Sequence, residues 1–138
     1  MAKMTKTEVH EWIQRADLDL SEAEFLLENN RPFENVAYFL HQALEKYLKA
    51  YLLYNRWELE KIHDLVKLTE TAKKYDKEFE PFVQLMRDMA SYYIESRYPV
   101  GYVVTYSRSE ITKSLKTAKR LKTLVLAKIT AQKTKKTI

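Results

Sequence analysis

The sequence predicts an all-α fold, an up-and-down bundle of four or five helices, and three observations support this prediction. The 138 residues include one glycine and three prolines, too few for the many tight turns of a strand-rich fold. Four stretches repeat apolar residues at steps of three and four, the period of an amphipathic helix. A further stretch, residues 35–55, is apolar on more than one stripe, and such a helix is usually covered on several sides. We therefore expect residues 35–55 to form the central helix.

The first helix should cover about residues 7–29, opened by a capping box of Thr5 and Glu8. It ends before Pro32, because proline disfavours a helical conformation in the residue that precedes it. The central helix should begin near Phe33 and fray at about Asn55. Its polar line is narrow and consists of Gln42, Glu45, Lys46 and Lys49.

A short third helix is predicted at about residues 64–75, with Asp64 as its N-terminal cap. The fourth helix covers about residues 79–95 and accommodates Pro81 in its first turn. A tyrosine-rich connection follows, and the last helix begins after Ser107, which forms a capping box with Glu110. Residues 130–138 lack a sustained apolar pattern, so we expect them to fray.

Length and composition predict one domain, residues 1–138, with a core of about 7–129 and a basic tail at 130–138. The chain has no cysteine, which excludes disulfides, thiolate metal sites and a cysteine nucleophile, and fits a reducing cytoplasm. No signal peptide can be drawn, and no apolar run approaches the ~20 residues of a membrane span. We expect a cytoplasmic protein, and its Lys- and Glu-rich composition is typical of thermophiles.

The net charge of +5 is unevenly distributed along the chain. Residues 111–138 contain nine of the 24 basic residues and none of the 19 acidic ones, so the other 110 residues carry a net charge of −4. A basic end can bind an anionic partner such as nucleic acid, and the alternative is a solvated lysine face offset by an acidic first helix. The basic side chains expected to be exposed on the last helix are Lys113, Lys116, Lys119, Arg120 and Lys122.

Two histidine positions deserve a chemical interpretation. His41, the pair His63 and Asp64, and a later Asp76 or Asp88 occur in the ligand order of helical metal phosphohydrolases of the HD class. The pair stands at the start of a short helix, where Asp64 has a capping role, so this class remains a minor alternative. The sequence shows neither a glycine-rich phosphate loop nor a Ser/His/Asp order typical of a hydrolase.

The segment Ser96-Arg97-Tyr98-Pro99 is the most distinctive local cluster. Arg97 suits the end of the fourth helix, where a cation interacts favourably with the helix dipole. In the functional interpretation, Arg97 faces a groove lined by Tyr98 and Tyr102 and binds a phosphate. Guanidinium groups match phosphate geometry, and tyrosine rings stack on bases.

Four segments together resemble the HEPN domain family: ADLD at 16–19, FLHQALEKYLKA at 39–50, HDL at 63–65 and SRYP at 96–99. The resemblance covers about residues 7–128 and implies a helical bundle that usually forms homodimers. Many HEPN proteins accompany a minimal nucleotidyltransferase, in operons that include toxin–antitoxin pairs, and others are metal-independent ribonucleases. Those ribonucleases carry an arginine and a histidine separated by four to six residues. Arg97 is similar to that arginine, but Tyr102, Val103 and Val104 occupy the three positions allowed for the histidine.

This departure argues against nuclease activity, because the family histidine acts in acid–base chemistry on the ribose 2′-hydroxyl. A tyrosine, with an ordinary pKa near ~10, is a poorer proton shuttle, and valine cannot serve at all. The leading hypothesis is therefore a non-catalytic HEPN protein that binds a nucleotide, RNA or a nucleotidyltransferase. Arg97 would hold phosphate, Tyr98 and Tyr102 would stack, and His41 and His63 would line the site, with no cofactor or metal.

Two other hypotheses stay open beside this one. The first is a metal-independent HEPN endoribonuclease with a divergent active site, and the second is a module whose partner is another protein. A homodimer is expected in each case, because the Tyr- and Val-rich segment 98–106 is too apolar for a free loop and aromatic clusters favour interfaces.

Overall fold

The computed structural model describes residues 6–95 and 106–136, with side chains described at positions 8–90 and 106–130. Within these ranges there are five α-helices, one turn of 3-10 helix and no strand, so the all-α prediction is confirmed. The elements are α1 (Lys6–Glu28), α2 (Phe33–Tyr54), α3 (Leu65–Tyr75), η1 (Lys77–Phe79), α4 (Glu80–Glu95) and α5 (Arg108–Lys136).

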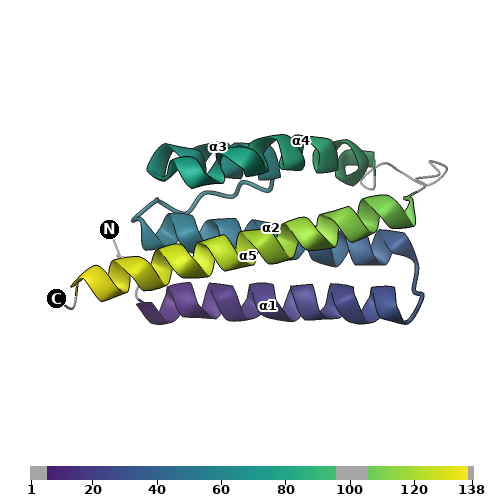
Figure 1. The fold of residues 1–138 in the computed structure, drawn as a ribbon, viewed down its shortest axis with the longest axis horizontal. Helices are drawn as coiled ribbons and strands as arrows, with labels where there is room; N and C mark the ends of the chain where they lie inside the picture. Colours follow the sequence, from purple (N-terminus) through teal and green to yellow (C-terminus); the bar gives the residue numbers. More distant parts are fainter. Residues whose placement is uncertain (1–5, 96–105, 137–138) are drawn as a thin grey trace.

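The helices form two layers around α2 (Figure 1). Helices α1 and α2 are an antiparallel pair, and α5 runs across them, in contact with both. Helices α3 and α4 form the second layer, on the side of α2 that is away from α1. Within the described ranges, no helix has the length and apolar character needed to cross a lipid bilayer.

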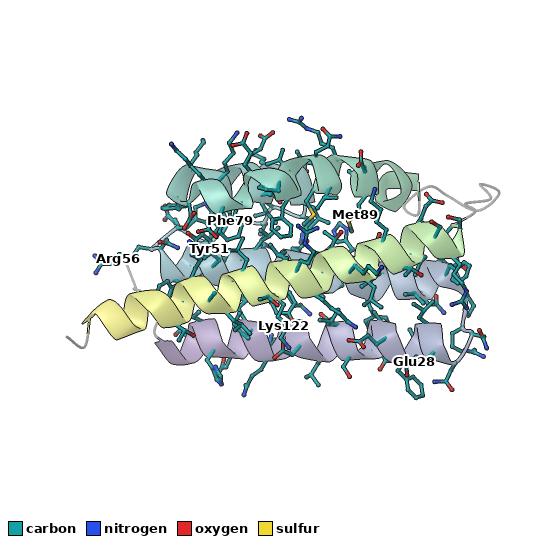
Figure 2. All side chains as sticks on the ribbon, viewed as in Figure 1. Glu28, Tyr51, Arg56, Phe79, Met89 and Lys122 are labelled. Carbon is teal, nitrogen blue, oxygen red and sulfur yellow. The ribbon has the colours of Figure 1, made fainter. Side chains whose placement is uncertain are left out.

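The core is built mainly on α2, as its wide apolar surface predicts. Fourteen of its 22 residues are buried. Tyr51 of α2 and Phe79 of η1 point toward each other between the two layers (Figure 2), with ring centroids 4.4 Å apart. Burying side chains of this size contributes roughly 1.5–3 kcal/mol each, so the contact stabilises the attachment of the second layer to α2.

Local sequence signals set the starts of α3 and α5. Asp64 Oδ1 accepts hydrogen bonds from the backbone N–H groups of Val66 and Lys67, at 3.0 and 3.2 Å, which confirms the predicted cap of α3. The predicted capping box of α5 is also present. Glu110 N donates to Ser107 Oγ, and Ser107 N donates to Glu110 Oε1, both at 3.0 Å.

One predicted helix end was wrong. The fourth helix begins at Glu80, one residue from its predicted start, and follows the η1 turn, whose N–H at Glu78 is capped by Asp76. The last helix continues to Lys136 instead of fraying from residue 130. It contains no Gly or Pro, and Ala, Gln and Lys are good helix formers, so helix propensity extends it past the apolar pattern. The predicted Thr5 cap and the segment 96–105 lie outside the described residues.

The narrow polar line of α2 is buried or half-buried throughout. Glu45 and Lys49 are only 5% and 4% exposed. Gln42 and Lys46 are half-buried. Charged residues are rarely buried without partners, so the surroundings of Glu45 are the first place to look for a functional site.

Candidate functional site

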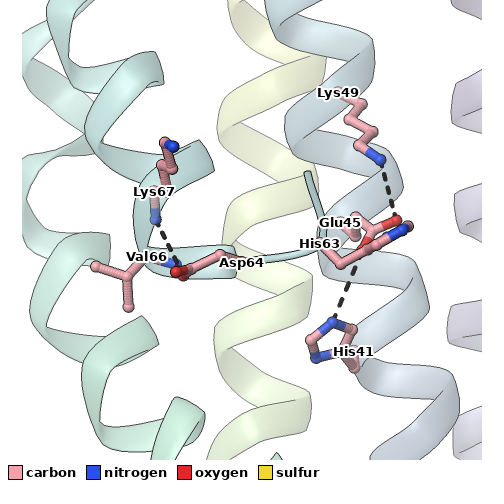
Figure 3. A network of polar contacts seen from close by, with 7 residues as sticks. All are labelled: His41, Glu45, Lys49, His63, Asp64, Val66 and Lys67. Carbon is pink, nitrogen blue, oxygen red and sulfur yellow. Dashed lines mark hydrogen bonds and ion pairs between the residues drawn. The ribbon is translucent and has the colours of Figure 1, made fainter. Parts of the chain in front are cut away.

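A cluster of charged and polar side chains surrounds Glu45 at the middle of α2 (Figure 3). His41 stands four residues before Glu45 and Lys49 four residues after it, so the three side chains share one side of the helix. His63 comes from the connection that leads into α3. We name these four residues the Glu45 cluster.

Both oxygens of the Glu45 carboxylate are engaged. Oε1 lies 3.0 Å from His63 Nδ1 and 3.8 Å from His41 Nε2, and Oε2 accepts a hydrogen bond from Lys49 Nζ at 3.2 Å. Lys49 Nζ also lies 6.0 Å from the centre of the Trp12 ring, a cation–π arrangement. The side chains of Glu45 and Lys49 are 7% and 5% exposed, whereas that of His63 is 62% exposed.

Glu45 is held in its ionised form. Burial alone raises the pKa of this carboxyl, but His41, His63 and Lys49 together outweigh burial and lower the pKa of Glu45 to about 2. An ionised carboxylate only accepts hydrogen bonds, so the contact with His63 requires the proton on Nδ1. In a neutral imidazole the other ring nitrogen, Nε2, is then the acceptor, and the His63 side chain is exposed enough for a ligand to reach it.

The two predicted site histidines therefore differ in their exposure to solvent. The structure brings His41 and His63 to the same carboxylate oxygen, but His41 is 9% exposed and belongs largely to the interior. Only His63, of these two, presents an open ring edge to solvent.

The HD-type metal alternative finds no support in this geometry. Within residues 8–90 and 106–130, no three His, Asp or Glu side chains are grouped closely enough to hold a metal ion. The carboxylate of Asp64 turns to the N-terminus of α3, away from His63 (Figure 3). The Asp76 carboxylate forms an ion pair with Lys128, whose Nζ lies 2.8 Å away, and this contact lowers the pKa of Asp76.

A second feature is a row of cations on the outer side of α5. Lys113, Lys116, Lys119 and Arg120 are all exposed, as the sequence predicts, and we name them the basic row. Steps of three and four residues place Lys113, Lys116 and Arg120 on one stripe about 10 Å long. Lys122 turns inward instead, is half-buried, and forms an ion pair with Asp17 of α1 at 3.2 Å.

The remaining predicted site residues, Arg97, Tyr98 and Tyr102, lie outside the described residues. In the sequence their segment comes between α4 and α5, and the N-terminal half of α5 carries the basic row.

Sequence reasoning missed the roles of Glu45 and Lys49. A glutamate four residues before a lysine is a recognisable helical ion-pair spacing, and His41 extends it by one turn. These spacings were available in the sequence. The contact between His63 and Glu45 could not be read from the sequence, because it depends on how α3 packs against α2.

Comparison with known proteins identifies a family and a similar structure. The HEPN domain model matches residues 9–129. A crystal structure described as that of an archaeal HEPN homologue superimposes with a TM-score of 0.65 and 20% sequence identity, covering 88% of this chain and 97% of the other. At that identity the likeness is one of fold. No curated protein matches the sequence significantly.

Proposed function

This chain belongs to the HEPN domain family, and we propose that it is a non-catalytic member that binds RNA, or a nucleotide, through phosphate contacts. The observation that carries the proposal is the basic row on α5. Lys and Arg side chains that neutralise phosphates release counterions, and this effect supplies most of the sequence-independent affinity for nucleic acid.

The ion pairs of α5 show which cations remain for a ligand. Lys119 pairs with Glu24 of α1 at 3.3 Å, and Lys122 with Asp17. Within the described part of the chain, Lys113, Lys116 and Arg120 make no ion pair with a carboxylate, although the Arg120 guanidinium lies 5.7 Å from the Phe82 ring centre. An anionic ligand therefore has three cations in a line to contact without breaking an internal ion pair.

The Glu45 cluster is less suited to phosphate. It contains one carboxylate and one ammonium group, so with neutral histidines its net charge is zero and it exerts little long-range attraction on an anion. We assign phosphate binding to α5 for this reason. Arg97 would add a guanidinium fork to the same ligand and Tyr98 and Tyr102 would add stacking, as the family resemblance implies.

The wider role belongs to the same proposal. It comprises a homodimer, a minimal nucleotidyltransferase as partner and one half of a toxin–antitoxin-like pair. These parts rest on the family, and a nucleotidyltransferase that copurifies with this chain and competes with RNA would link them to the α5 surface.

Binding of labelled single-stranded RNA across a salt series, in the presence of a chelator, tests the proposal. For single strands the logarithm of the affinity falls with log[salt] by about 0.7 per phosphate contact. The double variant Lys113→Ala/Lys116→Ala should lower this slope by roughly 1.4 and weaken binding, and Arg97→Ala should also weaken it. Lys74→Ala, which removes an exposed lysine of α3, is the matched control. Equal slopes for wild type and the double variant would refute the assignment to α5.

A second candidate function is metal-independent RNA cleavage, and the geometry of His63 favours it. A neutral imidazole that is oriented by an ionised carboxylate and belongs to an exposed side chain can accept a proton, which is the property the missing family histidine would supply. The same RNA incubation decides the matter. Cleavage in chelator that is lost in His63→Gln would make the protein a ribonuclease, and intact RNA would leave the binding function.

A further inference from the structure

A pocket of about 170 Å³ opens between α4 and α5 beside the basic row, and we propose that it receives one nucleobase of the bound RNA strand. This inference rests on the proposed function and adds a base-selective subsite to it. Its walls include Leu85, Asp88 and Met89 from α4 and Glu110 and Lys113 from α5.

The size and the apolar wall suit a flat ring. Pockets that enclose drug-sized ligands measure roughly 300–1,000 Å³, so a space of this volume accommodates only a fragment such as one base. Leu85 and Met89 provide an apolar surface, with Met89 only 4% exposed, and a thioether makes favourable contacts with aromatic rings.

The polar groups of the pocket are mainly acceptors. The hydroxyls of Ser114 and Thr117, which also line it, donate to the backbone carbonyls of Glu110 and Lys113 at 2.9 and 3.0 Å, so these O–H groups are already used. Asp88 Oδ1 accepts from Gln84 Nε2 at 3.0 Å, and Glu110 Oε1 accepts from Ser107 N. A carboxylate has about four lone-pair sites and can accept hydrogen bonds from several donors at once.

This chemistry selects among bases. Carboxylates accept hydrogen bonds from exocyclic amino groups such as cytosine N4, whereas the corresponding uracil O4 is itself an acceptor. The carboxylates also repel phosphate, so the backbone stays on the basic row while the base turns inward. Lys113 belongs to the basic row and also lines the pocket, and so connects phosphate binding to base selection.

Cytidine and uridine oligonucleotides of equal length test the inference, because they carry the same charge and differ at the atoms that face the carboxylates. Wild type should bind the cytidine oligonucleotide roughly five- to tenfold more tightly at neutral pH. Asp88→Asn should bring this ratio close to one. Glu34→Gln makes the same change of charge at an exposed site in the first turn of α2 and should preserve the ratio.

Leu85→Trp provides an independent variant, because it fills the pocket without changing its charge. It should reduce cytidine binding to the level of uridine binding and leave the salt dependence unchanged, with a thermal melt showing that the fold persists. Salt-dependent binding with no preference for cytidine would overturn the pocket and leave the proposed function standing. A preference that survives both Asp88→Asn and Leu85→Trp would also overturn the pocket. Absence of binding by every oligonucleotide would overturn both proposals.

Discussion

Helices α1 and α5 both pack against α2 but present opposite outer surfaces. Between positions 8 and 28, α1 has seven acidic residues and one Arg, and it exposes Leu18 and Phe25 to 71% and 58%. The outer side of α5 carries the basic row, and none of its described side chains is an exposed large hydrophobic. The inward apolar stripes of both helices pack into the same core, so the fold does not depend on the charges of either outer surface. Charge of opposite sign on two helices that pack against the same core therefore points to function.

The two charges are partly matched where the helices meet. Asp17 pairs with Lys122, and Glu24 with Lys119. These side chains are 35–53% exposed, and pairs of this kind contribute only about 0–1 kcal/mol. The opposite charges thus orient α5 on α1 only weakly.

The largest loss of stability should come from substitutions in the apolar stripes that α1 and α5 each turn towards the core. Leu20→Ala in α1 and Leu121→Ala in α5 each remove a buried side chain, 4% and 0% exposed, and each should lower the free energy of unfolding by about 2–5 kcal/mol. Urea denaturation of both variants measures this. A loss below 1 kcal/mol in only one of them would show that the two helices do not support the core equally.

A buried charge should behave differently from the exposed charges of α1 and α5. The pKa of Glu45 is lowered from 4.5 to about 2, so its ionised form stabilises the folded state at any pH above about 4.5. Wild type should exceed Glu45→Gln by about 2–3 kcal/mol at pH 5–7, and this difference should shrink as the pH falls from about 4.5 towards 2. Urea titrations across that range test it. A difference independent of pH would mean that Glu45 acts through shape alone.

Reversing charges on the two outer surfaces should affect RNA binding unequally. Lys113→Glu/Lys116→Glu in α5 should reduce affinity at least tenfold, because phosphate contacts are replaced by repulsion. Glu11→Lys/Glu22→Lys in α1 alters as many exposed charges and should change affinity much less, since screening over a Debye length of about 8 Å limits its reach. Affinities at physiological salt decide the comparison, and similar effects from both reversals would mean that only net charge matters.

Most of the fold could be predicted because its signals are local. The caps Asp64, Ser107 and Glu110 lie within three residues of the groups they satisfy, and apolar periodicity defines the inner stripes. The burial of Glu45 and Lys49 was not predicted, because a polar residue on a helix is normally exposed. It accompanies tertiary contacts, of His63 with Glu45 and of Trp12 with Lys49. The pocket was unpredictable for a similar reason, since it exists only where α4 lies against α5.

The wide apolar surface of α2 also has a consequence for biosynthesis. Helix α1 precedes α2 and can pair with it as soon as both have left the ribosome, in keeping with the rapid formation of contacts between neighbouring segments. Helix α5 is made last, yet it too packs against α2. Until α5 emerges, part of that surface lacks its cover and is open to premature association. The nascent chain is therefore most vulnerable between completion of α2 and completion of α5, the interval in which a chaperone would be of most use.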